Sequence, residues 1–396
     1  MDIPRKDTKF KKRHGRFNIF LFIVLILIII STSAGAYLNL NEIDLKNTSI
    51  KELFENRFYL GSDFGNKEVL LEMSYDSSAN AKFALHDDYI VKCTQGRIDF
   101  IDKRGEARRT FRGSLKNPLI KSKGNYLLIA DFKGKDMFVF RGINKLWEEK
   151  LNNNIINADI NEKGHVAVVH EEEMSRNAAS AFNREGVRYF VDNSGDEFIL
   201  SAKVSPDGDS ILLNYAITSG IGATTELKKY NIESKEQIEK TVVENEFFPF
   251  AEYIDDDTIM AVGDSYIAVL GDNLEEKWSA SAKGKVYSSS AGSDKYVIAA
   301  TELKGAGFFS NRKSDILIYD MGGERVADLN IENHVKNMVV YDDIIAVNLG
   351  RQLYIINSQG KIIDEYDFTT EIKYIDFFNK KEILVIVENK IIILNI

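Results

Sequence analysis

Cysteine, proline and histidine are scarce in this chain of 396 residues, and each scarcity argues against one kind of structural or functional feature. The single cysteine, Cys93, excludes an intramolecular disulfide, and its place in the apolar segment 89–94 predicts a buried, inert thiol. Four prolines leave little room for a proline-rich linker. The five histidines are too scattered to form a metal cluster or to serve a nucleophile. They are His14, His86, His165, His170 and His334.

Only the start of the chain carries a net positive charge, and the rest is net acidic. The net charge is −9, yet residues 1–16 carry seven Lys and Arg against Asp2 and Asp7, which leaves residues 17–396 at −14. An acidic body disfavours nucleic acid, whose phosphates need neutralisation by Lys and Arg. It also disfavours lying flat on anionic lipid. We therefore expect no nucleic-acid partner, and we place the basic segment at a membrane edge.

A long apolar run follows the basic segment. Residues 17–38 are apolar except for Asn18 and the polar step 31–33, and 22 residues suffice to span a bilayer as a helix. The basic flank predicts a cytoplasmic amino terminus and a carboxy-terminal domain outside the membrane. The segment 34–36 also fits a signal-peptidase site, so both an uncleaved anchor and a released domain remain open.

The remaining chain divides into a short connector and one large repeated domain. Residues 39–66 are polar and include Ser49–Glu52, which has the spacing of a capping box at the start of a short helix. Residues 67–396 contain short apolar strands that recur with a turn about every 40 residues. The aligned turns are 102–105, 140–144, 183–186, 233–236, 271–273, 320–323 and 357–360. Such a period predicts an all-β domain, a β-propeller.

The ends of this domain indicate how many blades it has. Residues 372–377, 382–387 and 390–395 form only three strands before the chain ends. The isolated strand 68–75 can supply the fourth and so remove an open sheet edge. We therefore predict an eight-bladed β-propeller whose last blade is closed by strand 68–75, with seven blades as the alternative.

Two tryptophans carry a family resemblance. Residues 145–147 and 274–278 each place a tryptophan, Trp147 or Trp278, after an apolar strand and a turn. This resembles the quinoprotein-type (PQQ-type, WD40-like) repeat. The chain from residue 17 onward resembles an uncharacterised family of single-pass membrane proteins with such repeats from Gram-positive bacteria. Quinoprotein-like members carry a tryptophan in nearly every repeat, whereas this chain has two in total, so we expect no cofactor.

The sequence motifs do not indicate a metal site or a catalytic site. The densest acidic runs, Glu171–Glu173 and Asp255–Asp257, lack the spacing of a calcium loop, so we interpret them as solvated loop charge. The segment 204–209 is typical of a hairpin turn and lacks the Gly-x-Ser-x-Gly frame of a catalytic serine. We therefore assign no catalytic, cofactor-binding or metal-ligating residue.

Three insertions indicate a binding surface. They fall at 171–180, 219–225 and 303–314, between the second and third strands of blades three, four and six. In a propeller these links share one face with the blade-to-blade connections, so the insertions predict a binding face there. The candidate residues of this face are Glu171, Arg176, Ile221, Phe308, Phe309, Arg312 and Lys313.

Two functions from different classes remain open. The preferred hypothesis is a membrane-anchored, non-catalytic interaction or scaffold module that binds an envelope protein or cell-wall glycan. The alternative is a quinoprotein-like or glycan-acting enzyme or cofactor binder with carboxylates in the central channel. A scaffold channel should be lined by small apolar or unpaired polar residues, whereas an enzyme should bring together at least two acidic groups with perturbed pKa values.

Overall fold

The computed structural model describes residues 67–193, 195–217, 224–243, 247–293, 295–303 and 313–396. The chain divides into two compact units, residues 1–61 and 62–396. The predicted basic tail, membrane span and connector (residues 1–66) lie outside the described residues. Within the described part of the chain, no helix combines the length and apolarity needed to cross a membrane.

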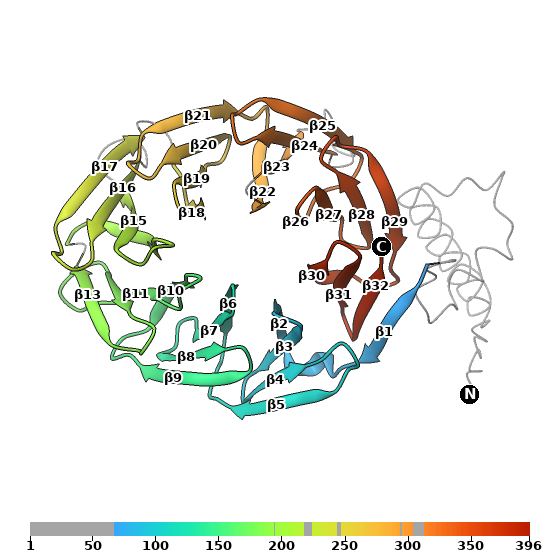
Figure 1. Cartoon of the computed structure of the whole chain (residues 1–396), viewed down its shortest axis with the longest axis horizontal. Coiled ribbons are helices and arrows are strands. Elements are labelled where there is room, and N and C mark those ends of the chain that lie inside the picture. Colours follow the sequence, from blue (N-terminus) through green and yellow to red (C-terminus); the bar gives the residue numbers. More distant parts are fainter. Residues whose placement is uncertain (1–66, 194, 218–223, 244–246, 294, 304–312) are drawn as a thin grey trace, which may run out of the picture. The chain divides into compact units, whose positions relative to one another are not determined.

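Eight four-stranded antiparallel sheets form a ring around a central opening (Figure 1). Seven of these blades each use four consecutive strands, counted from the inner to the outer edge. Blade 1 contains β2 (Lys82–His86), β3 (Tyr89–Thr94), β4 (Arg97–Ile101) and β5 (Ala107–Arg112). Blade 2 contains β6 (Pro118–Lys123), β7 (Tyr126–Asp131), β8 (Asp136–Arg141) and β9 (Asn144–Lys150). Blade 3 contains β10 (Ile155–Ile160), β11 (Val166–His170), β12 (Ala178–Phe182) and β13 (Arg188–Asn193).

The other consecutive blades follow the same order. Blade 4 contains β14 (Phe198–Val204), β15 (Ser210–Ile217), β16 (Thr224–Asn231) and β17 (Gln237–Val243). Blade 5 contains β18 (Phe250–Asp255), β19 (Thr258–Val262), β20 (Tyr266–Gly271) and β21 (Glu276–Ser281). Blade 6 contains β22 (Lys285–Ser293), β23 (Tyr296–Leu303), β24 (Lys313–Asp320) and β25 (Arg325–Ile331). Blade 7 contains β26 (Asn337–Tyr341), β27 (Ile344–Asn348), β28 (Gln352–Asn357) and β29 (Ile362–Asp367). All seven turns found in the sequence join a third strand to a fourth.

The eighth blade combines the two ends of the described domain, and we call it the split blade. It contains β30 (Ile372–Asn379), β31 (Glu382–Val387), β32 (Lys390–Asn395) and, as outer strand, β1 (Val69–Ser74). β1 runs antiparallel to β32, with Val69 opposite Leu394 and Ser74 opposite Lys390. This pairing confirms the eight-bladed prediction and excludes the seven-bladed alternative.

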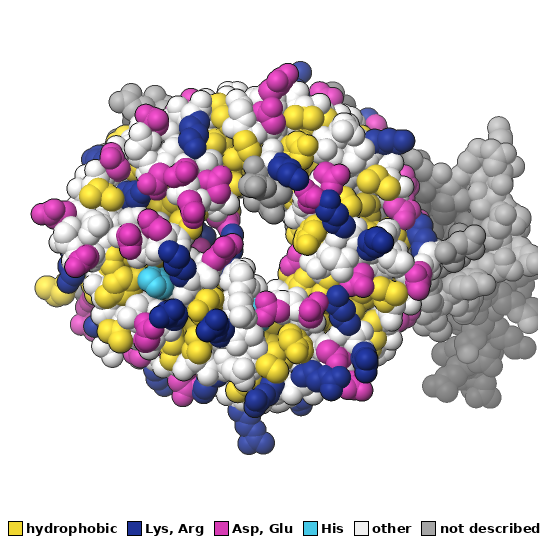
Figure 2. Space-filling model, in the orientation of Figure 1, with side chains coloured by type: hydrophobic (Ala, Val, Ile, Leu, Met, Phe, Trp, Pro, Cys, Tyr) yellow, Lys and Arg dark blue, Asp and Glu magenta, His cyan; other side chains and the backbone are white. Residues whose placement is uncertain are grey.

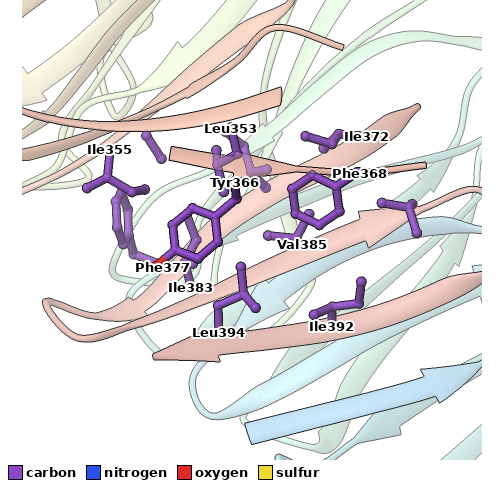
Figure 3. Packing of buried hydrophobic residues seen from close by; sticks show 13 residues of the cluster. Leu353, Ile355, Tyr366, Phe368, Ile372, Phe377, Ile383, Val385, Ile392 and Leu394 are labelled. Carbon is purple, nitrogen blue, oxygen red and sulfur yellow. The ribbon is translucent and has the colours of Figure 1, made fainter. Parts of the chain in front are cut away.

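Strand β32 buries a different side-chain set on each face because successive strand residues point in opposite directions. Ile392 and Leu394 pack in a cluster with residues of blade 7, including Tyr366 and Phe368 (Figure 3). Ile391 and Ile393 belong to a second cluster, with residues of blade 1. The last strand therefore joins both neighbours of the split blade.

The two tryptophans connect adjacent blades. The indole N–H of Trp278 in blade 5 donates to the carbonyl of Met321 in blade 6 (3.0 Å). Its ring lies against Gly323, where φ is +84° and an added Cβ would stand 2.6 Å from the indole. Trp147 in blade 2 likewise donates to the carbonyl of Arg184 in blade 3 (3.1 Å). Each tryptophan therefore ties its blade to the next one along the chain.

The single cysteine behaves as predicted. Cys93 is free and fully buried in β3. Burial raises the pKa of its thiol, and the nearby Asp99 carboxylate adds to that rise. The thiolate, which is the reactive form, is therefore suppressed.

Candidate interaction face and channel pocket

The antiparallel order of each blade defines two faces of the ring. The link face holds the loops between second and third strands together with the blade-to-blade connections, and the turn face holds the other turns. Hydrogen bonds join the two kinds of loop on the link face. Lys133 N donates to the carbonyl of Ile155 (2.8 Å), and Ile155 N donates to that of Gly134 (2.7 Å).

The predicted insertions are described only in part. In blade 3 the loop spans residues 171–177 and is shorter than predicted, because residues 178–180 belong to the buried strand β12. The loops 218–223 and 304–312 lie outside the described residues. The candidate residues Ile221, Phe308, Phe309 and Arg312 lie there too.

Three predicted site residues are described, and they do not form one cluster. Glu171 and Arg176 share the blade 3 loop. Lys313 is the first residue of β24 in blade 6, where its ammonium pairs with Glu332. The structure thus brings Glu171 and Arg176 into one loop and leaves Lys313 three blades away.

Buried side chains hold the blade 3 loop in place. The Asn177 amide donates to the carbonyl of Ile199 (2.8 Å) and accepts from the Ile199 N–H (3.0 Å). Nδ1 of the buried His170 lies 2.9 Å from the carbonyl of Glu171 and therefore donates to it. The Asn154 side chain donates to a Glu171 carboxylate oxygen (2.8 Å). The loop is therefore tied to blade 4 and to the connection between blades 2 and 3.

These contacts make a continuous surface that we call the blade 2–4 ridge. It consists of residues 132–135, 151–155, 171–177 and 195–199. Glu171 N donates to the carbonyl of Asn154 (2.9 Å), and Arg176 N donates to that of Gly195 (3.1 Å). Since every loop of the ridge is hydrogen-bonded to the next, the surface is preorganised.

Large apolar side chains stand exposed along the ridge. Met174 is 94% exposed, Phe198 40% and Phe132 36%. The Arg176 guanidinium lies 5.2 Å from the centre of the Phe198 ring, within cation–π range. Exposed apolar groups that gather on one surface are typical of protein interaction sites.

A second feature lies in the central channel, at the turn face, and we call it the channel pocket. It has a volume of about 100 Å³ and is lined by the ends of inner strands from consecutive blades. Lys203 of β14 pairs with Asp159 of β10 (2.8 Å). Lys123 of β6 pairs with Glu252 of β18 (3.1 Å), so this ion pair joins blade 2 to blade 5. Figure 2 shows acidic and basic side chains together around the opening.

The charges of the channel pocket stabilise one another. Burial opposes ionisation of Glu252, but Lys203 and Lys123 outweigh it and lower the pKa of this carboxyl. Burial likewise opposes the charged form of Lys203, but Asp159 and Glu252 raise its pKa. Both groups are therefore ionised at neutral pH. The channel thus differs from the small apolar or unpaired polar lining expected for a scaffold.

The acidic runs form no metal site. Asp255–Asp257 lies at the turn between β18 and β19, as the sequence predicts. Among the described residues, no three His, Cys, Asp or Glu side chains stand close enough together to hold a metal ion.

Residues 61–396 match a protein family described as "Family of unknown function (DUF5711)". The chain belongs to this family. No curated protein matches the sequence. The family description assigns no activity.

Several solved β-propellers resemble this structure. BamB from Moraxella catarrhalis is 11% identical with a TM-score of 0.54, over 83% of this chain and 100% of that one. Sqt1 from Chaetomium thermophilum is 10% identical with a TM-score of 0.55, over 84% and 97%. A quinohemoprotein alcohol dehydrogenase from Pseudomonas putida HK5 is 7% identical with a TM-score of 0.56, over 85% and 77%. At these identities the likeness shows the fold alone, a β-propeller.

Proposed function

We propose that this protein is a membrane-anchored, extracytoplasmic β-propeller that acts as a non-catalytic protein-interaction or scaffold module at the cell envelope. The observation that carries the proposal is the blade 2–4 ridge, where Phe132, Met174 and Phe198 stand exposed on one hydrogen-bonded surface. An exposed methionine adapts to the shape of a partner, and aromatic side chains contribute much of the binding free energy in interfaces.

The proposed membrane topology rests on the amino-acid sequence. The apolar run 17–38 follows a basic segment, so the propeller is expected outside the membrane with the amino terminus in the cytoplasm. An envelope protein or cell-wall glycan is the partner available to a propeller in that location. A location outside the membrane also agrees with the resemblance of this chain to single-pass membrane proteins of Gram-positive bacteria.

A structural neighbour supports peptide binding by a propeller of this shape. Sqt1 from Chaetomium thermophilum has been solved bound to the N-terminus of the ribosomal protein L10, with a TM-score of 0.53 to this chain. We infer that a polypeptide segment of a partner protein docks on the ridge in a comparable manner.

The channel carboxylates favour a non-catalytic role. Asp159 and Glu252 each face a lysine, and the pKa of Glu252 is lowered. A glycan-hydrolysing pair needs one carboxylic acid with a raised pKa, opposite to the direction found here. The ion pairs therefore do not provide the acid that such a mechanism requires.

The test is a pull-down from membranes with the full-length protein and a double variant, M174S/F198S. We expect the wild type to retain a specific partner and the variant to lose it. Ile363→Ser is the matched control, because Ile363 is 57% exposed on the outer strand of blade 7, away from the ridge. Equal retention by all three proteins, or recovery of the chain in the soluble cytoplasmic fraction, would overturn the proposal.

A further inference from the structure

A groove of about 460 Å³ lies where the split blade meets blade 1, and we call it the junction groove. It is lined by the connection from β1 to β2, by the start of β2 and by residues 371–374 at the start of β30. Since β1 to β2 is a blade-to-blade connection, the groove lies on the link face. Figure 1 shows β2 and β30 as neighbouring inner strands beside the central opening. The groove shares no residue with the blade 2–4 ridge or with the channel pocket.

Aromatic side chains form the walls of the groove, and hydrogen bonds fix two of them. The Tyr374 hydroxyl donates to an Asp376 carboxylate oxygen (2.6 Å) and accepts from the Leu85 N–H (3.1 Å). The Tyr75 hydroxyl donates to a backbone carbonyl at the end of β31 (2.8 Å). The Tyr75 ring meets the Phe83 ring edge-on, with centroids 4.9 Å apart. The walls are therefore preorganised, which lowers the cost of binding a ligand.

The charge of the groove is positive, although the domain as a whole is acidic. Lys82 and Lys373 line the groove and are exposed, and neither has a carboxylate within ion-pair distance among the described residues. Glu371 is the one acid among the described lining residues, and it pairs with Lys336 of the connection before blade 7 (3.0 Å). Asp76 adjoins the groove, but its carboxylate caps the short 3₁₀ helix that follows it. Two ammonium groups are therefore available to an anion.

Backbone geometry sets these two lysines at the same end of neighbouring strands. Lys82 is the first residue of β2 and Lys373 is the second of β30, and both inner strands begin at the link face. Lys373 is also the extra residue of a β-bulge, because two residues of β30 stand there against one residue of β31. Bulges re-aim side chains and are frequent next to functional sites. The bulge thus gives the second lysine a position that a regular strand would not.

The volume and the lining narrow the class of ligand. A dry cavity of about 150 Å³ holds benzene, so on that scale the groove has room for about 18 non-hydrogen atoms. A small inorganic anion would leave most of this volume empty, whereas a hexose that carries one phosphate or carboxylate group has about 13 to 16 such atoms. Ser77 and Asn80 add a hydroxyl and an amide to the lining. Aromatic walls with a few polar groups suit a ring that has apolar faces and hydroxyl edges.

We infer that the junction groove binds an anionic sugar of monosaccharide size. The phosphate or carboxylate group of the sugar pairs with Lys82 and Lys373, and its ring lies against the aromatic walls. Its hydroxyl groups form hydrogen bonds with Ser77 and Asn80. The inference goes beyond the proposed function, which is carried by the blade 2–4 ridge, so protein docking and sugar binding can each fail without the other.

Isothermal titration calorimetry of the purified full-length protein tests the inference, with glucose 6-phosphate and glucuronate as probes. We expect saturable binding of at least one probe in the millimolar range or tighter, and the tighter probe identifies the anionic group as phosphate or carboxylate. Glucose lacks the charge and inorganic phosphate lacks the ring, so each should bind at least about tenfold more weakly. Absence of saturable heat with both anionic sugars would overturn the inference. Glucose or inorganic phosphate binding as tightly as the better anionic sugar would overturn it as well.

Variants connect the binding to the groove. Lys82→Met and Lys373→Met each remove one ammonium group and keep the length of the side chain, and both positions are exposed, so the fold should persist. Each should weaken binding of the better probe about tenfold. Lys285→Met is the matched control, because Lys285 is likewise the exposed first residue of an inner strand, in blade 6, and this variant should bind as the wild type does. The midpoint of urea denaturation verifies that each variant is folded. Unchanged affinity in folded Lys82→Met and Lys373→Met proteins would contradict the assignment.

Discussion

The closing strand β32 offers a direct test of how the ring is held together. Ile392 and Ile393 are adjacent in sequence and are 0% and 1% exposed, yet they pack into different clusters. Ile392 contacts the blade 7 side, and Ile393 contacts the blade 1 side. Replacing each with alanine therefore weakens one junction of the split blade at a time.

The expected cost follows from burial. Truncating a fully buried isoleucine to alanine lowers the free energy of unfolding by about 2–5 kcal/mol, because burial of the removed atoms is lost and a cavity remains. The two substitutions act in different clusters, so the double variant should lose more stability than either single variant, with a cost of up to about 4–10 kcal/mol. A domain of ordinary stability has about 5–15 kcal/mol in total, so the double variant should be close to unfolding.

Urea denaturation monitored by circular dichroism measures these changes. Each single variant should shift the midpoint of the whole transition, because one ring unfolds as a unit. Ile363→Ala, on the exposed face of outer strand β29, should change the stability by less than about 0.5 kcal/mol. A separate early transition for the split blade, with the rest of the ring unchanged, would refute this argument.

Three further predictions follow from individual contacts. Gly323→Ala should lower the free energy of unfolding by more than about 1 kcal/mol, because φ is +84° and the new Cβ would meet Trp278. The midpoint of urea denaturation measures this change. Burial raises the pKa of the Asp376 carboxyl, so the native state binds its proton more tightly than the unfolded state does. The free energy of unfolding therefore falls as the pH rises above about 3.9, the pKa of an aspartate in the unfolded chain. Asp376→Asn should therefore be more stable than wild type at pH 8, with the difference disappearing at acidic pH in urea titrations. Cys93 should resist iodoacetamide in the native protein and react once urea unfolds it, as mass spectrometry can record; rapid native labelling would contradict its burial.

Local patterns predict much of the fold. The seven turns place the boundary between third and fourth strands, because glycine or asparagine in six of them permits a tight reversal. In the turn 233–236, Lys235 adopts the positive φ (+60°) instead. The split blade is predictable because three carboxy-terminal strands lack a fourth and strand 68–75 lacks a neighbour. The predicted membrane span 17–38 lies outside the described residues and remains a prediction.

The blade 2–4 ridge and the channel pocket are harder to predict from the sequence. Met174 follows directly after Glu171–Glu173, and an apolar residue within a charged loop is a signal that indicates exposure. Phe132 and Phe198 offer no such signal, because their exposure depends on how blades 2 to 4 pack. Lys203 and Glu252 are 49 positions apart and meet only when adjacent blades bring the ends of their inner strands to one channel.

Site-specific photo-crosslinking in intact cells tests the central claim most directly. A photoreactive amino acid is placed at Met174 in the ridge and, in a separate protein, at Ile363 on the outer strand of blade 7. The proposed function predicts a discrete adduct with one envelope protein from position 174 and none from position 363. No adduct at position 174, or the same adducts at both positions, would contradict it.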